Sequence, residues 1–83
     1  MTVLEAPIQQ LTTRVDARGL SCPMPIVRTA QAVKALQSGA IVEVLATDPG
    51  STKDFAAWCR ATGNVLLEQS VDGTVYRFVI RRK

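Results

Sequence analysis

The order of apolar and turn-forming segments predicts an α/β (α+β) fold, a two-layer α/β sandwich with the element order β-α-β-α-β-β. Two segments repeat apolar side chains with helical spacing, and several short segments are rich in β-branched residues or alternate apolar with polar ones. Turns containing glycine or proline separate them. In a chain of 83 residues, helices with one apolar stripe each can cover only one face of a sheet. We therefore expect two helices on one face of a four-stranded mixed sheet.

The first predicted strand is Thr13–Ala17, which the turn-prone pair Arg18-Gly19 ends. A rival α-β-α-β-β interpretation omits this strand and leaves the next helix in place. That helix is predicted from about Pro23 to Gln37, and Gly39 is expected to stop it as a C-terminal cap. Its apolar side would carry Ile26, Ala30, Val33 and Leu36.

The middle of the chain predicts a strand at Ala40–Thr47, followed by the turn Asp48-Pro49-Gly50. A second helix follows and ends at Gly63. Ser51 and Asp54 have the spacing of a variant capping box at its start. Its apolar face would carry Phe55, Trp58, Cys59 and Thr62.

The last part of the chain predicts a β-hairpin. Asn64–Val71 and Thr74–Arg81 read as strands, and Asp72-Gly73 between them suits a tight two-residue turn. In the final strand, apolar residues alternate with a set of residues that is mostly polar. One face of this strand should therefore pack against the core, and the other should be at least partly exposed to water.

The composition excludes several kinds of site. Histidine is absent, which rules out a Cys-His or Ser-His catalytic pair within the chain and any metal site that needs imidazole. The chain has 2 cysteines, too few for a structural zinc site or for a typical disulfide framework, so a reducing compartment is expected. We predict no metal and no cofactor.

Charge and terminal sequence give weaker indications. The net charge of +3 equals the contribution of the C-terminal run Arg81, Arg82 and Lys83, so it is weak evidence for direct contact with nucleic acid. Met1–Leu11 lacks the cationic start and long apolar run of a signal peptide, and no stretch is long enough to span a bilayer. We expect a cytoplasmic protein that does not bind membranes.

The segment Gly19–Pro25 holds the residue with the clearest chemistry, Cys22. Either Cys22 caps the first helix and Pro23 begins it, or Met24 is the cap and Pro25 begins it. Both placements leave the sulfur near the positive end of the helix dipole, which favours a reactive thiolate. The alternative is a small buried hydrophobe, but a glycine and two prolines that fix the surrounding backbone favour a reactive cysteine.

The run Asp16–Pro25 (Asp-Ala-Arg-Gly-Leu-Ser-Cys-Pro-Met-Pro) resembles the D-x-x-G-L-x-C-P-x-P signature of the TusA (SirA/YedF-like) sulfur-carrier family. Val44–Asp54 resembles that family's strand, D-P turn and second helix start, and the Asp72-Gly73 hairpin resembles its C-terminal end. The similarity predicts one sulfur-carrier domain over residues 14–83, with residues 1–13 as an N-terminal extension.

The resemblance implies a sulfurtransferase in which Cys22 carries sulfur as a persulfide. Its partners would be a donor, either a cysteine desulfurase or a rhodanese, and an acceptor sulfurtransferase with a reactive thiol. The pathway would be tRNA thiolation and cofactor biosynthesis, or oxidation of reduced sulfur compounds. A monomer that forms transient complexes would suit such exchange.

Several other residues are candidates for supporting roles. Gly19, Pro23 and Pro25 would position the Cys22 loop. Asp48 is expected either to help form the surface around the sulfur or to cap the second helix. Four basic residues are candidates to surround the first helix: Arg14, Arg18, Arg28 and Lys34. Of these, Arg18 and Arg28 are the residues expected to contact acidic patches on partner proteins.

Cys59 shares a predicted helix face with Phe55 and Trp58, so a buried structural role is favoured over a second reactive thiol.

The alternative function of the protein is a non-catalytic regulatory module that binds RNA or protein. It is disfavoured because Tyr76 and Phe78 share the predicted apolar face, which leaves no platform for stacking bases.

Overall fold

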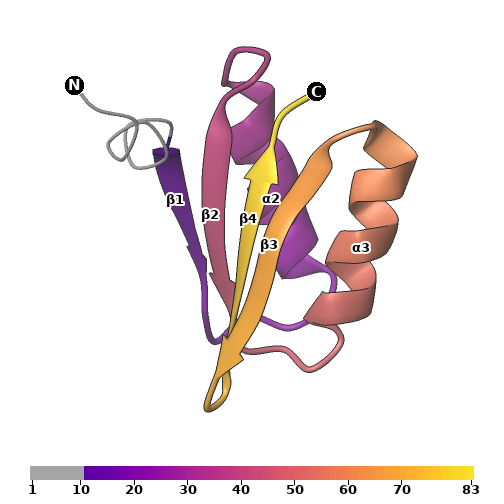
Figure 1. Ribbon diagram of the computed structural model, residues 1–83. Helices are drawn as coiled ribbons and strands as arrows, with labels where there is room; N and C mark the ends of the chain where they lie inside the picture. The colour runs from indigo at the N-terminus through magenta and orange to yellow at the C-terminus, as the bar shows by residue number, and fades with distance from the viewer. Residues whose placement is uncertain (1–10) are drawn as a thin grey trace, which may run out of the picture.

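The computed structural model describes residues 11–83 and has the predicted order of strands and helices (Figure 1). The elements are β1 Leu11–Ala17, α2 Met24–Lys34, β2 Ile41–Ala46, α3 Ser51–Thr62, β3 Val65–Asp72 and β4 Val75–Arg81. The sheet order is β1-β2-β4-β3. The first pair is parallel and the other two pairs are antiparallel. The mixed four-stranded sheet is thus confirmed, and the interpretation without a first strand is wrong.

The N-terminal boundary differs from the prediction. The extension expected over residues 1–13 lies mostly outside the described residues, and its last part belongs to β1, which begins at Leu11. Neither helix in the described part of the chain has the length and apolar character needed to cross a bilayer.

The parallel pairing of β1 and β2 determines where the site lies. Because parallel strands end at the same edge of a sheet, the loops after β1 and β2 meet there. The backbone N–H of Gly19 donates to the hydroxyl of Thr47 at 2.9 Å and ties the two loops together. Both helices also begin at this edge, which is the lower end of the molecule in Figure 1.

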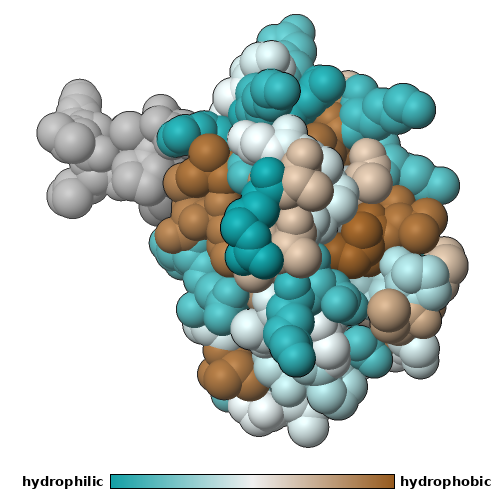
Figure 2. All heavy atoms as spheres, turned by 90° about the vertical axis from the view of Figure 1, so that its right-hand side faces the viewer, coloured by the Kyte–Doolittle hydropathy of each residue, from teal (hydrophilic) through white to brown (hydrophobic). Residues whose placement is uncertain are grey.

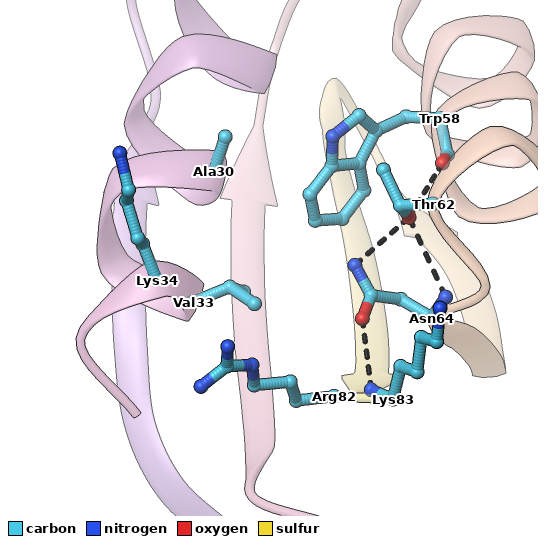
Figure 3. A pocket seen from close by; sticks show the side chains of 8 residues that line it. All are labelled: Ala30, Val33, Lys34, Trp58, Thr62, Asn64, Arg82 and Lys83. Carbon is cyan, nitrogen blue, oxygen red and sulfur yellow. Dashed lines mark hydrogen bonds between the residues drawn. The ribbon is translucent and has the colours of Figure 1, made fainter. Parts of the chain in front are cut away.

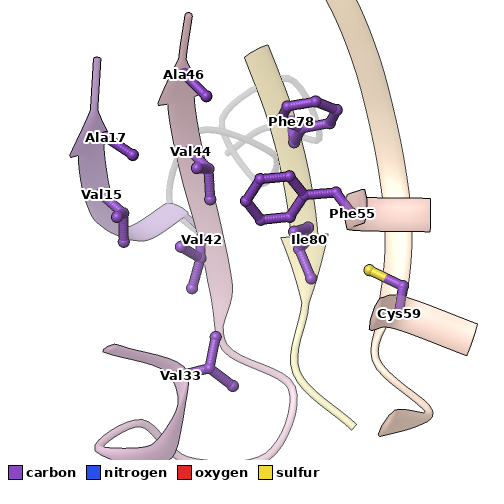
Figure 4. Packing of buried hydrophobic residues seen from close by; sticks show 10 residues of the cluster. All are labelled: Val15, Ala17, Val33, Val42, Val44, Ala46, Phe55, Cys59, Phe78 and Ile80. Carbon is purple, nitrogen blue, oxygen red and sulfur yellow. The ribbon is translucent and has the colours of Figure 1, made fainter. Parts of the chain in front are cut away.

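One apolar core fills the space between the sheet and the two helices (Figure 4). Phe55 of α3 is fully buried, and its ring stacks on Phe78 of β4 with centroids 4.6 Å apart. Cys59, one turn further along α3, is also buried. The other members of this cluster are Val15, Ala17, Val33, Val42, Val44, Ala46 and Ile80. The predicted packed face of the last strand is therefore confirmed.

Helix α2 ends earlier than predicted. Its cap is Ala35 rather than Gly39, because the amides of Ala35 and Leu36 donate to carbonyls three residues earlier and tighten the last turn. Gly39 instead has a φ of +87° in the following loop, where its N–H donates to the Arg82 carbonyl. Of the predicted apolar face, Val33 is buried and Ile26 and Leu36 pack against the core. The helix also buries Pro25 and Thr29, which the prediction did not include.

Two local predictions at α3 and the hairpin are also corrected. Gly50 caps α3 without a side-chain hydrogen bond, and Ser51 is buried in the first turn, so the predicted capping box does not form. At the other end, Gly63 caps the helix with a φ of +83°, as predicted. The hairpin loop is Gly73-Thr74 rather than Asp72-Gly73, because Asp72 still pairs with Val75.

The sheet face opposite the helices carries a charged cluster. Glu43 is 5% exposed there and accepts hydrogen bonds from Arg14, at 2.5 Å, and from Arg77. Arg77 also pairs with Glu68 at 3.0 Å. The prediction that Arg14 lies beside the first helix is therefore wrong, because alternation along β1 turns its side chain to the other face.

Candidate functional site

The loop between β1 and α2 is fixed at both ends. The N–H of Leu20 donates to the carbonyl of Ala17 at 3.3 Å, which turns the chain directly after β1. Gly19 has a φ of +81°, a conformation that favours glycine, and its amide is held by Thr47. The loop therefore holds Cys22 at the edge where both helices begin.

Cys22 lies in a second tight turn, directly before α2. The N–H of Met24 donates to the Ser21 carbonyl at 2.9 Å, so Cys22 and Pro23 occupy the centre of this turn. The Cys22–Pro23 peptide bond is cis. Pro23 is the N-cap of α2 and Pro25 lies in its first turn, so neither predicted cap, Cys22 or Met24, is correct. Cys22 lies just outside the helix, exposed and free of any disulfide.

The charges around Cys22 differ from the prediction. A hydrogen bond with the Asp54 carboxylate raises the pKa of the Cys22 thiol, and desolvation and the negative charges of Asp54 and Asp48 act in the same direction. These acidic surroundings act against the thiolate that the dipole of α2 was expected to favour.

Asp48 and Asp54 approach the sulfur from the start of α3. The N–H of Gly50 donates to Asp48 Oδ2 at 3.1 Å, and the N–H of Asp54 donates to the Gly50 carbonyl at 3.0 Å. A Cβ built at Gly50 would stand 3.1 Å from Asp48 Oδ2 and 3.6 Å from Asp54 Oδ2, so the two carboxylates converge on this glycine. Asp48 thus orders the turn before α3 and also acts on Cys22.

Sequence reasoning missed Asp54 as a site residue. Its spacing from Ser51 suggested a helix cap, but its carboxylate contacts Cys22, which lies 32 positions away. The available signal was the turn Asp48-Pro49-Gly50, since the first turn of the helix that follows it faces the same edge as the Cys22 loop.

The two predicted docking residues have different surroundings. Arg18 forms a two-pronged ion pair with Asp16, at 2.8 and 2.9 Å, and this pair lowers the pKa of Asp16 to about 2. Arg28 is exposed on α2 and pairs with no residue in 11–83. Met24 and Val27 on the same helix are 41% and 36% exposed, so α2 presents apolar side chains to solvent close to Cys22 in the sequence.

The second cysteine does not belong to this site. Cys59 is 5% exposed in the core, and burial raises the pKa of its thiol. Within residues 11–83 no group of acidic and cysteine side chains has the arrangement of a metal site.

Comparison with known proteins identifies relatives along nearly the whole domain. Residues 13–82 match the family model described as sulfurtransferase TusA. The putative sulfur carrier protein YrkI of Bacillus subtilis is 50% identical over 68 residues, which cover 82% of this chain and 91% of that protein. The sulfur carrier protein TusA of Allochromatium vinosum is 46% identical over 68 residues, covering 82% and 90%. The crystal structure of a SirA-like protein from Desulfitobacterium hafniense superposes with a TM-score of 0.74 at 25% identity, covering 84% of this chain and 96% of that one.

Proposed function

The chain belongs to the TusA family of sulfur carriers, and from this premise we propose that Cys22 carries the transferred sulfur as a persulfide. The observation that carries the proposal is the exposure of Cys22 in a fixed turn, whereas Cys59, the second of the 2 cysteines, is buried. A protein-bound persulfide can be passed on only if the sulfur is accessible. The family assignment takes the place of the predicted alternative, a non-catalytic binding module.

Loading exchanges one S–S bond for another. The Cys22 sulfur attacks the outer sulfur of a donor Cys–S–SH group, the donor S–S bond breaks, and the donor cysteine leaves as a thiolate. Cys22 becomes Cys–S–SH with no net oxidation. Discharge is the same exchange between Cys22 and the acceptor. An acceptor thiolate takes the outer sulfur of the Cys22 persulfide, and Cys22 leaves as a thiolate.

The Asp54 carboxylate accounts for the proton in both steps. Because the resting Cys22 is a thiol hydrogen-bonded to Asp54, its proton passes to this carboxylate as the sulfur attacks. Asp54 then gives the proton to the departing donor thiolate. On discharge, Asp54 takes the proton of the acceptor thiol, which leaves the attacking acceptor thiolate, and then gives this proton to the departing Cys22 thiolate. A chain without histidine thus still has a proton acceptor beside its nucleophile.

The partners follow from this chemistry. The donor must hold a persulfide, as a cysteine desulfurase or a rhodanese does, and the acceptor is a sulfurtransferase with a reactive thiol. Met24 and Val27, both exposed beside Cys22, supply an apolar contact that donor and acceptor use in turn, and Arg28 adds a cation. The acceptor feeds either tRNA thiolation and cofactor biosynthesis or the oxidation of reduced sulfur compounds.

Intact-mass measurement tests the carrier residue. The protein is incubated with thiosulfate and a rhodanese, and we expect a gain of about one sulfur atom that a reductant removes. Cys22→Ser should abolish the gain, whereas the matched variant Cys59→Ser should keep it. A gain that persists in Cys22→Ser, or disappears only in Cys59→Ser, would contradict the assignment.

A second experiment tests Asp54. In Asp54→Asn the negative charge is lost, so the pKa of Cys22 falls and alkylation by iodoacetamide at neutral pH becomes faster, while sulfur loading becomes slower because the proton acceptor is gone. Asp48→Asn is the matched control, because Asp48 acts on Cys22 by charge alone. It should accelerate alkylation without slowing loading. If loading in Asp54→Asn accelerates together with alkylation, Asp54 is not the proton acceptor.

A further inference from the structure

A concave feature lies between the C-terminal halves of the two helices, at the end of the molecule opposite Cys22. It is a hollow of about 290 Å³, with Ala30 and Val33 of α2 on one side and Trp58 of α3 on the other. Figure 3 shows the indole ring projecting toward α2 across this space, and Arg82 extending beneath Val33. We call it the Trp58 groove.

The hydrogen-bond acceptors among the side chains of the Trp58 groove are already engaged. The Thr62 hydroxyl donates to the Trp58 carbonyl at 2.8 Å and accepts from the Asn64 side-chain amide at 2.9 Å. Asn64 Oδ1 in turn accepts the backbone N–H of Lys83 at 2.9 Å. A ligand that enters the groove therefore finds no free side-chain acceptor among these lining residues.

The side-chain polar groups that remain in the groove are donors, and three of the lining residues, Lys34, Arg82 and Lys83, are cations. The indole N–H of Trp58, the guanidinium of Arg82 and the ammonium of Lys34 have no hydrogen-bond or ion-pair partner within residues 11–83. No aspartate or glutamate side chain lines the groove. Viewed from the α3 side in Figure 2, hydrophilic residues gather at the upper end of the molecule, where the chain ends. This pattern favours a ligand that brings negative charge and acceptors.

Size and shape favour a protein side chain over an enclosed small molecule. A volume of about 290 Å³ is at the lower limit of the ~300–1,000 Å³ typical of pockets that enclose small ligands. It is enough for one aromatic or large aliphatic side chain between the Trp58 ring and the apolar wall of Val33. Such an anchor in a pocket, surrounded by charged contacts, is the usual form of a strong peptide contact.

We propose that the Trp58 groove binds an acidic segment of a sulfur-relay partner protein, with one apolar anchor residue against Trp58 and carboxylates at Arg82 and Lys34. The identity of the partner as a relay protein rests on the proposed function, but the binding itself does not. Helix α2 has 11 residues, so its two ends are separated by about 16 Å. A partner held in the groove therefore leaves Cys22 uncovered for sulfur exchange.

Peptide binding tests the proposal directly. Trp58 is the one tryptophan of the chain, so its fluorescence reports on the groove alone. The probe is an acetylated, amidated pentapeptide with one phenylalanine flanked by two aspartates and two glutamates. We expect saturable binding that added salt weakens. The affinity for the peptide should be about threefold lower in Arg82→Gln and in Lys34→Gln. It should be about tenfold lower when the phenylalanine of the peptide is replaced by alanine.

Matched controls separate a specific groove from general attraction. Arg60→Gln changes the net charge equally, and Arg60 lies on α3 outside the groove, so it should leave binding unchanged. Equal weakening by Arg60→Gln, or an equal fluorescence change with sodium sulfate alone, would overturn the proposal, as would no response to the peptide. Sulfur loading of Cys22 is measured on the same variants and should stay normal. If the wild-type chain showed no sulfur loading of Cys22, this would count against the proposed function and not against binding in the groove.

Discussion

Replacing Phe55 by alanine should remove the central contact between α3 and the sheet. The ring has no exposed surface, stacks on Phe78 at a centroid distance of 4.6 Å and meets Trp58 edge-on at 6.3 Å. Truncation of a buried phenylalanine costs about 3–5 kcal/mol, which combines the lost transfer free energy with the cavity left behind. The stacked pair places the expected loss toward the upper end of this range.

The loss is large compared with the stability of a domain of this size. At 0.05–0.15 kcal/mol per residue, 83 residues have a free energy of unfolding of about 4–12 kcal/mol. Urea unfolding followed by circular dichroism measures the change. With a slope of about 1 kcal/mol per M, the midpoint of Phe55→Ala should be lower by about 3–5 M or the variant should be unfolded without urea.

Two controls make the result interpretable. Phe55→Leu retains most of the apolar volume and should cost less than about 1.5 kcal/mol. Val71→Ala, at a position that is 59% exposed in β3, should change stability by no more than about 0.5 kcal/mol. A loss below about 1 kcal/mol in Phe55→Ala would refute the reasoning, because a ring packed on both sides cannot be removed at so small a cost.

Three further predictions concern charge, the second cysteine and a helix end. Arg77 and Arg14 lower the pKa of Glu43 below its ordinary 4.5, so its contribution to stability is complete above pH 4.5 and is lost as the pH falls through the folded-state pKa. Urea midpoints measured between neutral and acidic pH should therefore fall less steeply in Glu43→Gln than in the wild type. Cys59→Ala should lower the free energy of unfolding by about 1 kcal/mol, and mass spectrometry should show unchanged sulfur loading. Gly63→Ala should destabilise by about 1–2 kcal/mol in thermal unfolding, because Gly63 has a φ of +83° and a Cβ there would stand 3.0 Å from Lys83 Cδ.

The sequence was sufficient to predict the order of the elements and the mixed sheet. Strand β4 shows why, since the alternation that places Phe78 and Ile80 in the core is a local property of the chain with a period of two. Gly63 was equally predictable, because a glycine after an amphipathic segment is the usual helix stop.

Features that depend on contacts between distant segments were not predictable in this way. Asp54 has the spacing of a capping residue from Ser51, and only the folded chain brings its carboxylate to Cys22. The end of α2 was misplaced for a similar reason, because Gly39 is held by the Arg82 carbonyl from the other end of the chain. The motif around Cys22 identified the candidate cysteine, but its state of protonation depends on charges from α3.

The hydrogen bond between Cys22 and Asp54 has a consequence for chemical selectivity. Peroxides and small electrophiles react with thiolates, so an exposed cysteine that is kept protonated is protected from them while the carrier is alone. A cation brought near Asp54 or Asp48 would offset their negative charge and favour the thiolate, so the reactivity of this open sulfur depends on what stands beside it.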